Sequence, residues 1–310
     1  MASVTIVIPI RNRASYLPRL FRSLSAVDYE DLEVLLVDNG SSDSSLAQCR
    51  AYAQDAPMFV RVLQEPNTGA NNARNLGLAQ CQTEWIYFFD CDDEFTPSFL
   101  GELMPHATTN CDLIVFPTNL VIDGRVKKRS FVASTFVASQ ILSSTFNTQG
   151  MLLRTDFLRK IGGWDSRLQV WQDWELGIRL LLHCPRVTFL PERAYHLLHQ
   201  HSDSLTGPSM SSRLPAREQA IRIVAAEIND ADSRRALRFR LAILNGILLH
   251  EGANESKISL SASWITSALS CILTCYTRMG GRGAWRVALQ FCKHYRFNFT
   301  LAPASTQNPG

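Results

Sequence analysis

Three carboxylates stand just after one of the most apolar stretches of the chain. Trp85-Ile86-Tyr87-Phe88-Phe89 has the pattern of a strand buried on both faces, and Asp90-Cys91-Asp92-Asp93 follows it. Ligands of open α/β sheets bind outside the carboxyl ends of the strands, and Mg²⁺ or Mn²⁺ prefers carboxylate and phosphate oxygens. These residues therefore suggest a divalent cation and the anion that it carries. The alternative is a solvated acidic loop before a helix that starts near Thr96-Pro97.

The elements before the acidic segment alternate between strand and helix. Expected strands cover 4–10, 32–37, 60–64 and 85–89, and expected helices cover 16–24, 44–54 and 71–79. This alternation predicts an α/β fold with a doubly wound, mostly parallel sheet flanked by helices. Polar residues follow each strand, and they meet at one edge of such a sheet, where a nucleotide could lie over them. The residues of this row are Pro9, Arg11, Asn12, Asp38, Asn67, Gly69, Asp90 and Asp92.

Several residues of the row have side chains that suit a nucleotide. Asp38 could accept a hydrogen bond from a base N–H, and Arg11 and Arg74 could each bind phosphate through two N–H groups. Asp38 also fits a simple turn, because Asn39-Gly40 follows it. No G-x-G-x-x-G and no P-loop motif follows the first strand, which disfavours a dinucleotide or P-loop fold.

The rest of the chain continues the α/β pattern and then becomes helical. We expect a helix at 97–105, strands at 113–117 and 187–190, a hairpin at 120–132, a strand and helix within 149–158, a helix from Trp171, and a histidine-rich loop at 195–206. From Arg213 onward the apolar spacing is helical. We therefore expect an α/β domain at 1–210, a helical region at 211–302 and a disordered tail at 303–310.

Composition limits the class of protein. The chain has 310 residues, 46% of them hydrophobic, and a net charge of +3, so disorder and nucleic-acid binding are poorly supported. Residues 211–310 hold thirteen Lys and Arg against six Asp and Glu. This basic region could contact a membrane peripherally or be a solvated helical face. The uncharged segment 258–276 favours a buried or interfacial helix over a membrane span.

Cysteine usage and the N-terminus indicate the compartment. Eight cysteines are scattered without a C-x-x-C pair, which favours a reduced, cytoplasmic setting. The apolar run from Val4 to Ile10 is too short for a signal peptide.

The motifs taken in order resemble family 2 glycosyltransferases of the GT-A fold. The similarity covers about residues 3–206 and leaves 211–310 outside the shared pattern. The motifs that carry it are Val7-Ile8-Pro9-Ile10-Arg11-Asn12, Leu36-Val37-Asp38-Asn39-Gly40-Ser41-Ser42-Asp43, Asn67-Thr68-Gly69 with Ala73-Arg74-Asn75, Phe89-Asp90-Cys91-Asp92-Asp93, Ile161-Gly162-Gly163-Trp164-Asp165, and Trp171-Gln172-Asp173-Trp174-Glu175-Leu176.

The resemblance implies a role for each matching residue. Asp38 would hold the base, and Asp173 would be the catalytic base. Those implied to bind the nucleotide sugar are Pro9, Arg11, Asn12, Asp38, Asn67, Gly69, Arg74, Asn75, Asp90 and Cys91. Those implied to bind the metal are Asp92 and His201, with His199 and Asp93 as further candidates. Two positions depart from the family: Gln172 stands where glutamate is frequent, and Asn39 where a second aspartate is, a change we attribute to turn chemistry.

The chemistry implied is an inverting transfer. A nucleotide sugar, most often a UDP-sugar in such enzymes, would donate to a hydroxyl of a glycan or lipid-linked acceptor with Mg²⁺ or Mn²⁺ bound. Asp173 could instead be a first-turn acid that complements the helix dipole, and the histidines could be loop residues in water. Trp164 and Trp171 could stack on the acceptor, whereas Trp174 fits the core better. A nucleotidyltransferase and a catalytically silent nucleotide-sugar-binding module are the alternatives.

Overall fold

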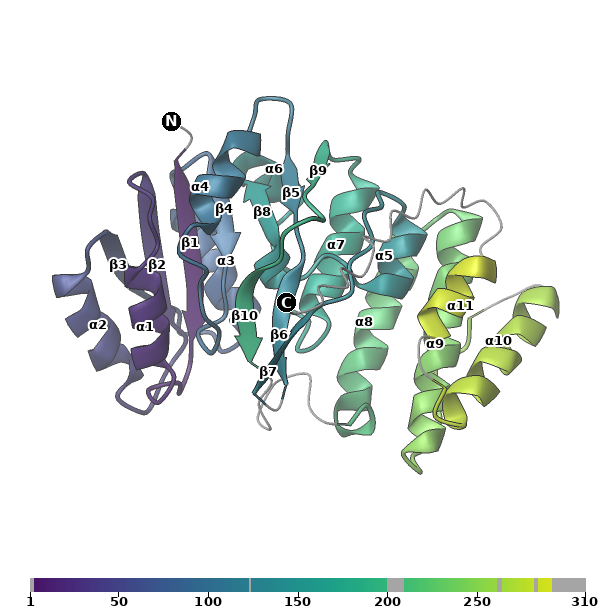
Figure 1. Ribbon diagram of the computed structural model, residues 1–310. Helices are drawn as coiled ribbons and strands as arrows, with labels where there is room; N and C mark the ends of the chain where they lie inside the picture. Colours follow the sequence, from purple (N-terminus) through teal and green to yellow (C-terminus); the bar gives the residue numbers. More distant parts are fainter. Residues whose placement is uncertain (1–2, 123, 200–208, 261–263, 282–283, 292–310) are drawn as a thin grey trace, which may run out of the picture.

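The computed structural model of the protein describes residues 3–122, 124–199, 209–260, 264–281 and 284–291. Two sheets form in this part of the chain, with helices packed around them (Figure 1). The larger sheet has the strand order β3-β2-β1-β4-β8-β5-β9, and the smaller one β10-β6-β7. The strands are β1 (Val4–Ile10), β2 (Leu32–Asp38), β3 (Phe59–Gln64), β4 (Trp85–Phe88), β5 (Leu113–Val115), β6 (Thr118–Ile122), β7 (Arg125–Lys128), β8 (Met151–Arg154), β9 (Val187–Phe189) and β10 (Tyr195–His199).

The helices follow the expected order. Those within the first 210 residues are α1 (Leu17–Ser25), α2 (Ser45–Asp55), α3 (Ala70–Gln80), α4 (Phe99–Leu103), α5 (Val137–Ser143), α6 (Thr155–Lys160) and α7 (Gln172–Leu182), with short 3₁₀ turns at Met104–His106 and Thr148–Gly150. A further 3₁₀ turn at Ser211–Arg213 precedes α8 (Leu214–Glu227), α9 (Ala231–His250), α10 (Trp264–Arg278) and α11 (Ala284–Phe291). The predicted α/β class, with helices toward the C-terminus, is confirmed.

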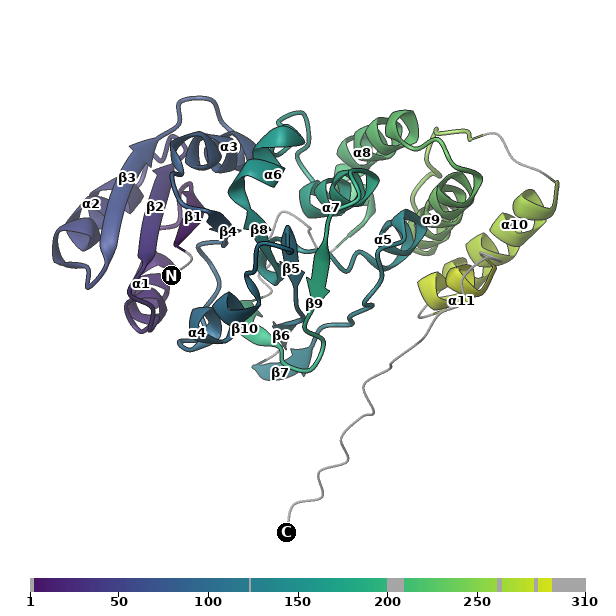
Figure 2. The same cartoon turned by 90° about the horizontal axis from the view of Figure 1, so that it is seen from above.

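Strand β1 lies inside the larger sheet because both of its faces are apolar. It pairs in parallel with β2 and with β4. Val4, Ile6 and Ile8 pack into the core cluster that includes α1, α2 and α4, whereas Val7 packs into the cluster that includes α3, α6 and α7. Figure 2 shows these two sets of helices on opposite faces of the sheet. A continuous β-branched run is what a strand covered on both faces requires.

One strand of the larger sheet runs against the others. β8 pairs antiparallel with both β4 and β5, whereas β5 and β9 are parallel. The sheet is therefore mixed, and the parallel pairing predicted from strand and helix alternation holds for β3, β2, β1 and β4.

The predicted histidine-rich loop at 195–206 is wrong over its first five residues. Tyr195–His199 forms β10, which pairs in parallel with β6, and Leu197 makes an isolated antiparallel bridge to Glu94. The remaining part of that segment, 200–206, lies outside the described residues. Helix α5 was not predicted, and it packs on α7 and α9.

The C-terminal helices share a core with the α/β part. One cluster joins residues of α8, α9, α10 and α11 to residues of α5 and α7. Trp174 of α7 lies in it at 1% exposure, which confirms its expected core position. The division of the chain at residue 210 stays a prediction. Among the described residues, no helix is long and apolar enough to cross a bilayer.

Helix α3 approaches β1 so closely that one position needs glycine. A Cβ built on Gly77 would overlap the Val7 side chain. By contrast, a Cβ on Gly101 of α4 would meet no atom within 4 Å.

These two glycines give a matched test of that contact. We expect Gly77→Ala to lower the free energy of unfolding by about 1–3 kcal/mol, because overpacking outweighs the gain in helix propensity. Gly101→Ala should be neutral or stabilise by up to about 1 kcal/mol. Urea unfolding of both variants measures the difference, and equal shifts would contradict the proposed close packing.

Candidate active site

The first two strand ends of the predicted row meet at one edge of the sheet. Ile10 pairs with Asp38 in the register of β1 and β2, and the Asn39 N–H donates to the Ile10 carbonyl at 2.8 Å. On the other side of β1, the Phe89 N–H donates to the Val7 carbonyl. The loops after β1, β2 and β4 therefore begin side by side, as the parallel pairing requires.

Asp38 carries an unsatisfied oxygen in this edge. The residue is 2% exposed, and its Oδ2 accepts from the Ser41 N–H at 3.3 Å. Its Oδ1 is buried and has no hydrogen-bond partner among the described residues. A buried acceptor without a partner costs free energy, so a ligand that supplies a donor here would bind favourably.

The loop after β1 is fixed to the loop after β2. Asn12 has a left-handed backbone (φ 50°), its N–H donates to Ser41 Oγ, and its Oδ1 accepts from the Ser42 N–H at 2.8 Å. Arg11, next to it, is exposed, while Pro9 lies within β1 and is partly buried. Arg11 thus points its charge to solvent at the site edge.

Asn39 does more than form a turn, which corrects the expectation from sequence. Its side chain is buried, its Nδ2 donates to the carbonyls of Glu65 and Asn67, and its Oδ1 accepts from the Gly69 N–H at 2.6 Å. Gly69 has φ 136°, a backbone that favours glycine. Asn39 therefore holds the loop that carries Asn67 and Gly69 against the end of β2, and an ionised aspartate could not donate these bonds.

Arg74 joins two parts of the site that are far apart in sequence. It is 4% exposed, and its guanidinium lies over the Trp164 ring at 4.5 Å. One terminal nitrogen donates to Asp90 Oδ1 and the other to Gln172 Oε1, both at 2.8 Å. Arg74 thus connects Asp90 to the residue before Asp173, and the phosphate contact expected of it from sequence stays a prediction.

Gln149 organises the acidic segment from the opposite side. Its Nε2 donates to Asp90 Oδ2 at 2.7 Å and to Asp93 Oδ2 at 2.8 Å. The other Asp93 oxygen accepts from the His199 N–H. Burial raises the pKa of Asp93 well above its usual range, and the nearby Asp90 and Asp92 carboxylates raise it further. Asp93 therefore connects the segment to β10 and is poorly placed to be a free metal ligand.

The two central residues of the segment have opposite environments. Cys91 is buried in the core, so its thiol faces away from solvent. Asp92 is partly buried, and its carbonyl accepts from the Arg19 guanidinium.

The histidines divide into three cases. His201, predicted as a metal ligand, lies outside the described residues. His199, the second choice, has its Nε2 2.5 Å from Glu94 Oε1. His196, one of the histidines of the expected loop, is fully buried among Phe89, Phe95 and Phe99. Burial lowers the pKa of His196 to about 3.

Asp173 lies in the first turn of α7 and is partly buried. Its Oδ1 accepts from the Trp174 N–H at 2.9 Å. Trp171, the residue at the N-cap, has a left-handed backbone (φ 57°), which is a genuine outlier for a bulky side chain. Strain of this kind is frequent where a functional residue must be held in one place.

A residue from the C-terminal helices reaches this turn, and sequence reasoning missed it. The Arg240 guanidinium, from α9, lies 4.7 Å from the Trp171 ring and 5.3 Å from the Trp174 ring. Burial lowers the pKa of Arg240 to about 10, and the Asp173 carboxylate opposes this shift. Arg240 is therefore a cation beside Asp173 at neutral pH. Its position on a distant helix gave no local signal.

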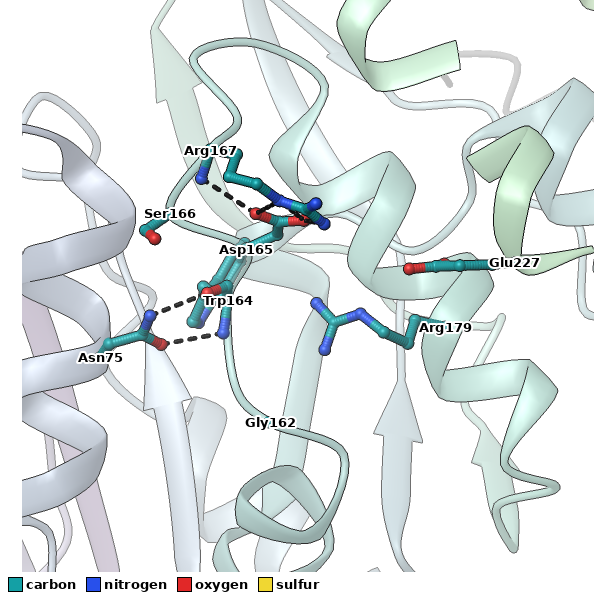
Figure 3. Close-up of a pocket in the computed structure, with 8 residues that line it drawn as sticks. All are labelled: Asn75, Gly162, Trp164, Asp165, Ser166, Arg167, Arg179 and Glu227. Carbon is teal, nitrogen blue, oxygen red and sulfur yellow. Dashed lines mark hydrogen bonds and ion pairs between the residues drawn. The ribbon is translucent and has the colours of Figure 1, made fainter. Parts of the chain in front are cut away.

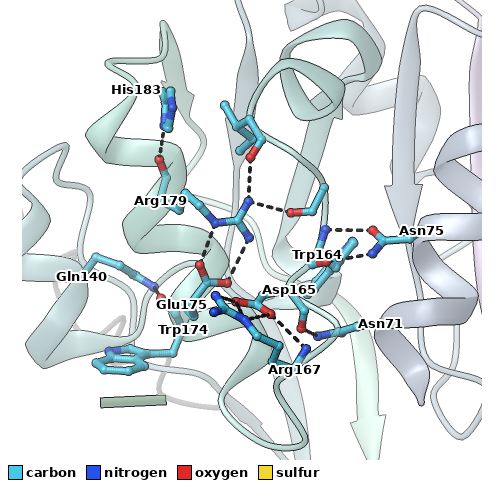
Figure 4. A network of polar contacts seen from close by, with 12 residues as sticks. Asn71, Asn75, Gln140, Trp164, Asp165, Arg167, Trp174, Glu175, Arg179 and His183 are labelled. Atoms are coloured by element: carbon cyan, nitrogen blue, oxygen red, sulfur yellow. Dashed lines mark hydrogen bonds and ion pairs between the residues drawn. The ribbon is translucent and has the colours of Figure 1, made fainter. Parts of the chain in front are cut away.

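Asn75 fixes the turn that carries Trp164. Its Oδ1 accepts from the Trp164 N–H at 2.8 Å and its Nδ2 donates to the Trp164 carbonyl at 2.7 Å, as Figure 3 shows. Arg179 holds the same turn from α7 by donating to the carbonyls of Ile161 and Gly163, while Glu175 accepts from its other nitrogens (Figure 4). Asn75 thus supports the turn, and the wall around base and ribose that it was expected to shape remains a prediction.

A polar pocket of about 390 Å³ opens beside this turn (Figure 3). It includes Asn75 from the predicted nucleotide set but none of the aspartates at 38, 90, 92 and 173. Glu227 lines it, and burial, followed by the Glu175 charge, raises the pKa of that carboxyl.

The donor set at the strand ends fits a divalent cation that is shared with a ligand. No group of three His, Cys, Asp or Glu side chains that could hold a metal occurs among the described residues. Mg²⁺ and Mn²⁺ do not need such a group when a diphosphate supplies further oxygens, and Asp90 and Asp92 would supply the carboxylates. The chemistry of the residues therefore suits a metal–diphosphate group better than a cage made by protein alone.

Comparison with known proteins agrees with this geometry. The sequence model for "Glycosyl transferase family 2" matches residues 5–157. An uncharacterized glycosyltransferase of Nostoc sp. is 28% identical over 245 residues, which cover 73% of this chain and 74% of that protein. Among solved structures, S. aureus TarS 1–349 in complex with UDP-GlcNAc has a TM-score of 0.62 at 17% identity, covering 96% of this chain and 94% of that one. A mannosyltransferase of Pyrobaculum calidifontis in complex with GDP-Man and Mn²⁺ has a TM-score of 0.59 at 15% identity, covering 94% and 84%.

The fold is therefore the GT-A fold of these glycosyltransferases, and residues 5–157 belong to glycosyl transferase family 2. As a member of that family it is a glycosyltransferase.

The buried His196 gives a test of how β10 is held beside the acidic segment. The unfolded chain takes up a proton at this residue below about pH 6.5, whereas the folded chain does so only near pH 3. Stability should therefore fall by about 1.4 kcal/mol for each pH unit below 6.5 through this group alone. His196→Asn keeps an acceptor for the Thr96 N–H and tolerates the left-handed backbone, so it should remove that slope.

Urea unfolding at several pH values measures the slope in both proteins. The difference in unfolding free energy between wild type and His196→Asn should shrink as pH falls from 7 to 5, by about 2 kcal/mol. A constant difference across this range would contradict a neutral, buried His196.

Proposed function

We propose that this glycosyltransferase is inverting and metal-dependent, and that it moves a sugar from a nucleotide sugar, a UDP-sugar in the first instance, to a hydroxyl of a glycan or lipid-linked acceptor. The observation that carries the proposal is the pair of hydrogen bonds from Arg74 to Asp90 and Gln172. This bridge places the start of α7, and so Asp173, at the sheet edge that holds Asp90. The donor and acceptor sides of a displacement reaction can thus lie next to each other.

The donor would lie across the strand ends. The unpartnered Oδ1 of Asp38 would accept a hydrogen bond from the base, and Asn39 would hold the loop with Asn67 and Gly69 along the nucleotide. Arg11 is exposed at this edge, where its guanidinium can meet phosphate oxygens. The solved complexes of similar fold that contain UDP-GlcNAc or GDP-Man support a nucleotide-sugar donor.

Asp90 and Asp92 would hold the metal–diphosphate group. A bound Mg²⁺ or Mn²⁺ would neutralise negative charge on the departing nucleoside diphosphate. Arg74 and Gln149 fix both oxygens of Asp90, and Asp92, the metal ligand that the resemblance implies, follows two residues later. His201 and His199 remain candidates for a further contact, as the resemblance implies.

Asp173 would accept the proton of the attacking hydroxyl. Because one base acts opposite the leaving group, the displacement inverts the anomeric configuration. Arg240 places a positive charge beside the Asp173 carboxylate that would act as the base. The Trp171 ring, partly buried next to Asp173, offers an apolar surface on which a sugar ring could stack.

Asp173→Asn tests the base. The amide oxygen can still accept from the Trp174 N–H, so the helix start should be kept, while proton transfer is lost. We expect sugar transfer to fall by about 10²–10⁴-fold with UDP affinity changed less than about threefold. Asp156→Asn, at an exposed site of α6, is the matched control and should retain activity. A parallel loss of transfer and UDP binding would refute the assignment of Asp173 as base.

Asp92→Ala tests the metal. We expect wild-type affinity for UDP to rise with Mn²⁺ or Mg²⁺, and the variant to lose about tenfold in affinity, about 1.4 kcal/mol, only when the cation is present. Asp55→Ala, at the exposed end of α2, should behave as wild type. Calorimetry with UDP in metal and in chelator measures both. A loss for Asp92→Ala that is the same in chelator would count against ligation.

A further inference from the structure

The turn that carries Asp173 contains a residue in an unfavourable backbone conformation. Trp171 is left-handed (φ 57°) although its side chain is large, and α7 begins at the next residue, Gln172. Such a residue persists only where its surroundings hold it in place. Contacts that hold Trp171 therefore also hold Asp173, which follows two residues later.

Arg240 of α9 packs against this turn. Its guanidinium lies 4.7 Å from the Trp171 ring and 5.3 Å from the Trp174 ring, and these two rings meet edge to face at 5.3 Å. A contact between a cation and an aromatic ring is stronger where water is excluded, and Trp174 is buried. Arg240 therefore holds one ring before Asp173 and one ring after it.

The same guanidinium is also bonded to the end of α5. Its Nη1 donates to Ser144 Oγ at 3.1 Å and to the Leu142 carbonyl at 3.4 Å. A buried segment, residues 145–149, follows directly. Its last residue, Gln149, donates to two aspartates of the acidic segment. Arg240 thus connects the start of α7 with the chain that leads to the acidic segment.

Helix α5 and the start of α7 are joined by further hydrogen bonds. Gln140 Nε2 donates to the Trp174 carbonyl at 3.4 Å (Figure 4), and Gln140 Oε1 accepts from the Phe146 N–H at 3.0 Å. Trp174 Nε1 donates to the Ile141 carbonyl at 3.0 Å. These bonds make α5 and the start of α7 one connected unit, and Arg240 ties that unit to α9.

We propose that Arg240 is a positioning residue for sugar transfer, which holds the Trp171 ring and the end of α5 so that Asp173 stays aimed at the acceptor hydroxyl. The inference rests on the proposed role of Asp173 as the base. Arg240 lies outside residues 5–157, which match the family model. A displacement of about 1 Å at a reacting group can cost a factor of about 10² in rate, so loss of Arg240 should slow turnover and leave donor binding in place.

Steady-state kinetics of Arg240→Met test the proposal. UDP release is measured with UDP-glucose, UDP-galactose and UDP-GlcNAc in Mn²⁺, and the donor that wild type turns over fastest is used for every variant. We expect kcat to fall at least about tenfold, with KM for the donor and affinity for UDP within about threefold of wild type. Arg240→Lys keeps the cation and should recover at least about a third of wild-type kcat. Arg234→Met, at an exposed position of α9, is the matched control and should behave as wild type.

The same change in the Asp173→Asn background shows whether Arg240 acts through the base. Adding Arg240→Met there should lower turnover by less than about twofold, because no base remains to be positioned. A further fall of about tenfold in the double variant, or wild-type kcat in Arg240→Met alone, would overturn the inference. Wild-type turnover by Asp173→Asn, or no UDP release by wild type, would instead refute the proposed function on which the inference rests.

Ser144→Gly keeps the test decisive if Arg240→Met does not fold. It removes the hydroxyl that accepts from Arg240, and glycine suits the left-handed backbone of this position (φ 50°). We expect kcat to fall about two- to fivefold, the effect of one hydrogen bond, with KM for the donor unchanged. Urea unfolding shows which variants are folded under the assay conditions. Wild-type kcat in folded Ser144→Gly, with Arg240→Met unfolded, would overturn the inference.

Discussion

The arrangement of the site depends on one buried cation, the guanidinium of Arg74. A charge removed from water is tolerated only when it is paired and hydrogen-bonded, and Arg74 has Asp90, Gln172 and Asn71 as partners and the Trp164 ring beneath it. These partners come from the end of β4, from α7, from α3 itself and from the turn before α7. The hydrogen bonds of Arg74 therefore fix the acidic segment after β4 relative to the start of α7. The strained backbone of Trp171 directly precedes Gln172, one of these partners.

The acidic segment shows how environment gives similar side chains different roles. Asp90 is paired with Arg74, Asp93 is buried with a raised pKa and accepts from Gln149 and the β10 backbone, and Asp92 is partly exposed. Three ionised carboxylates so close together would repel one another strongly. Pairing one of them and favouring the protonated form of another lowers this repulsion.

Sequence predicted what depends on local pattern. The β-branched run of β1 and the apolar run of β4 gave the buried strands, and parallel pairing then gave the row of polar strand ends. It failed where a partner distant in sequence decides the outcome. His196 is polar and suggested a loop. In the structure it is buried against Phe89, which directly follows β4, and Phe99 of α4. Asn39 suggested a turn because the neighbouring sequence does not reveal its contacts to the loop after β3. Arg240 was missed because it lies 67 positions after Asp173 and belongs to no motif.

Helix α9 connects the turn that holds Asp173 to helix α10. One side contributes Arg240 to the turn that holds Asp173, and Gly246 and Ala242 receive the hydroxyl-bearing side of α10. On α10, Thr266, Leu273 and Thr277 are buried, whereas Ile272 and Met279 are exposed. Helix α9 therefore brings a cation to the start of α7 and also carries α10. A region outside the motifs of the family thus contributes both to the site and to the surface beyond it.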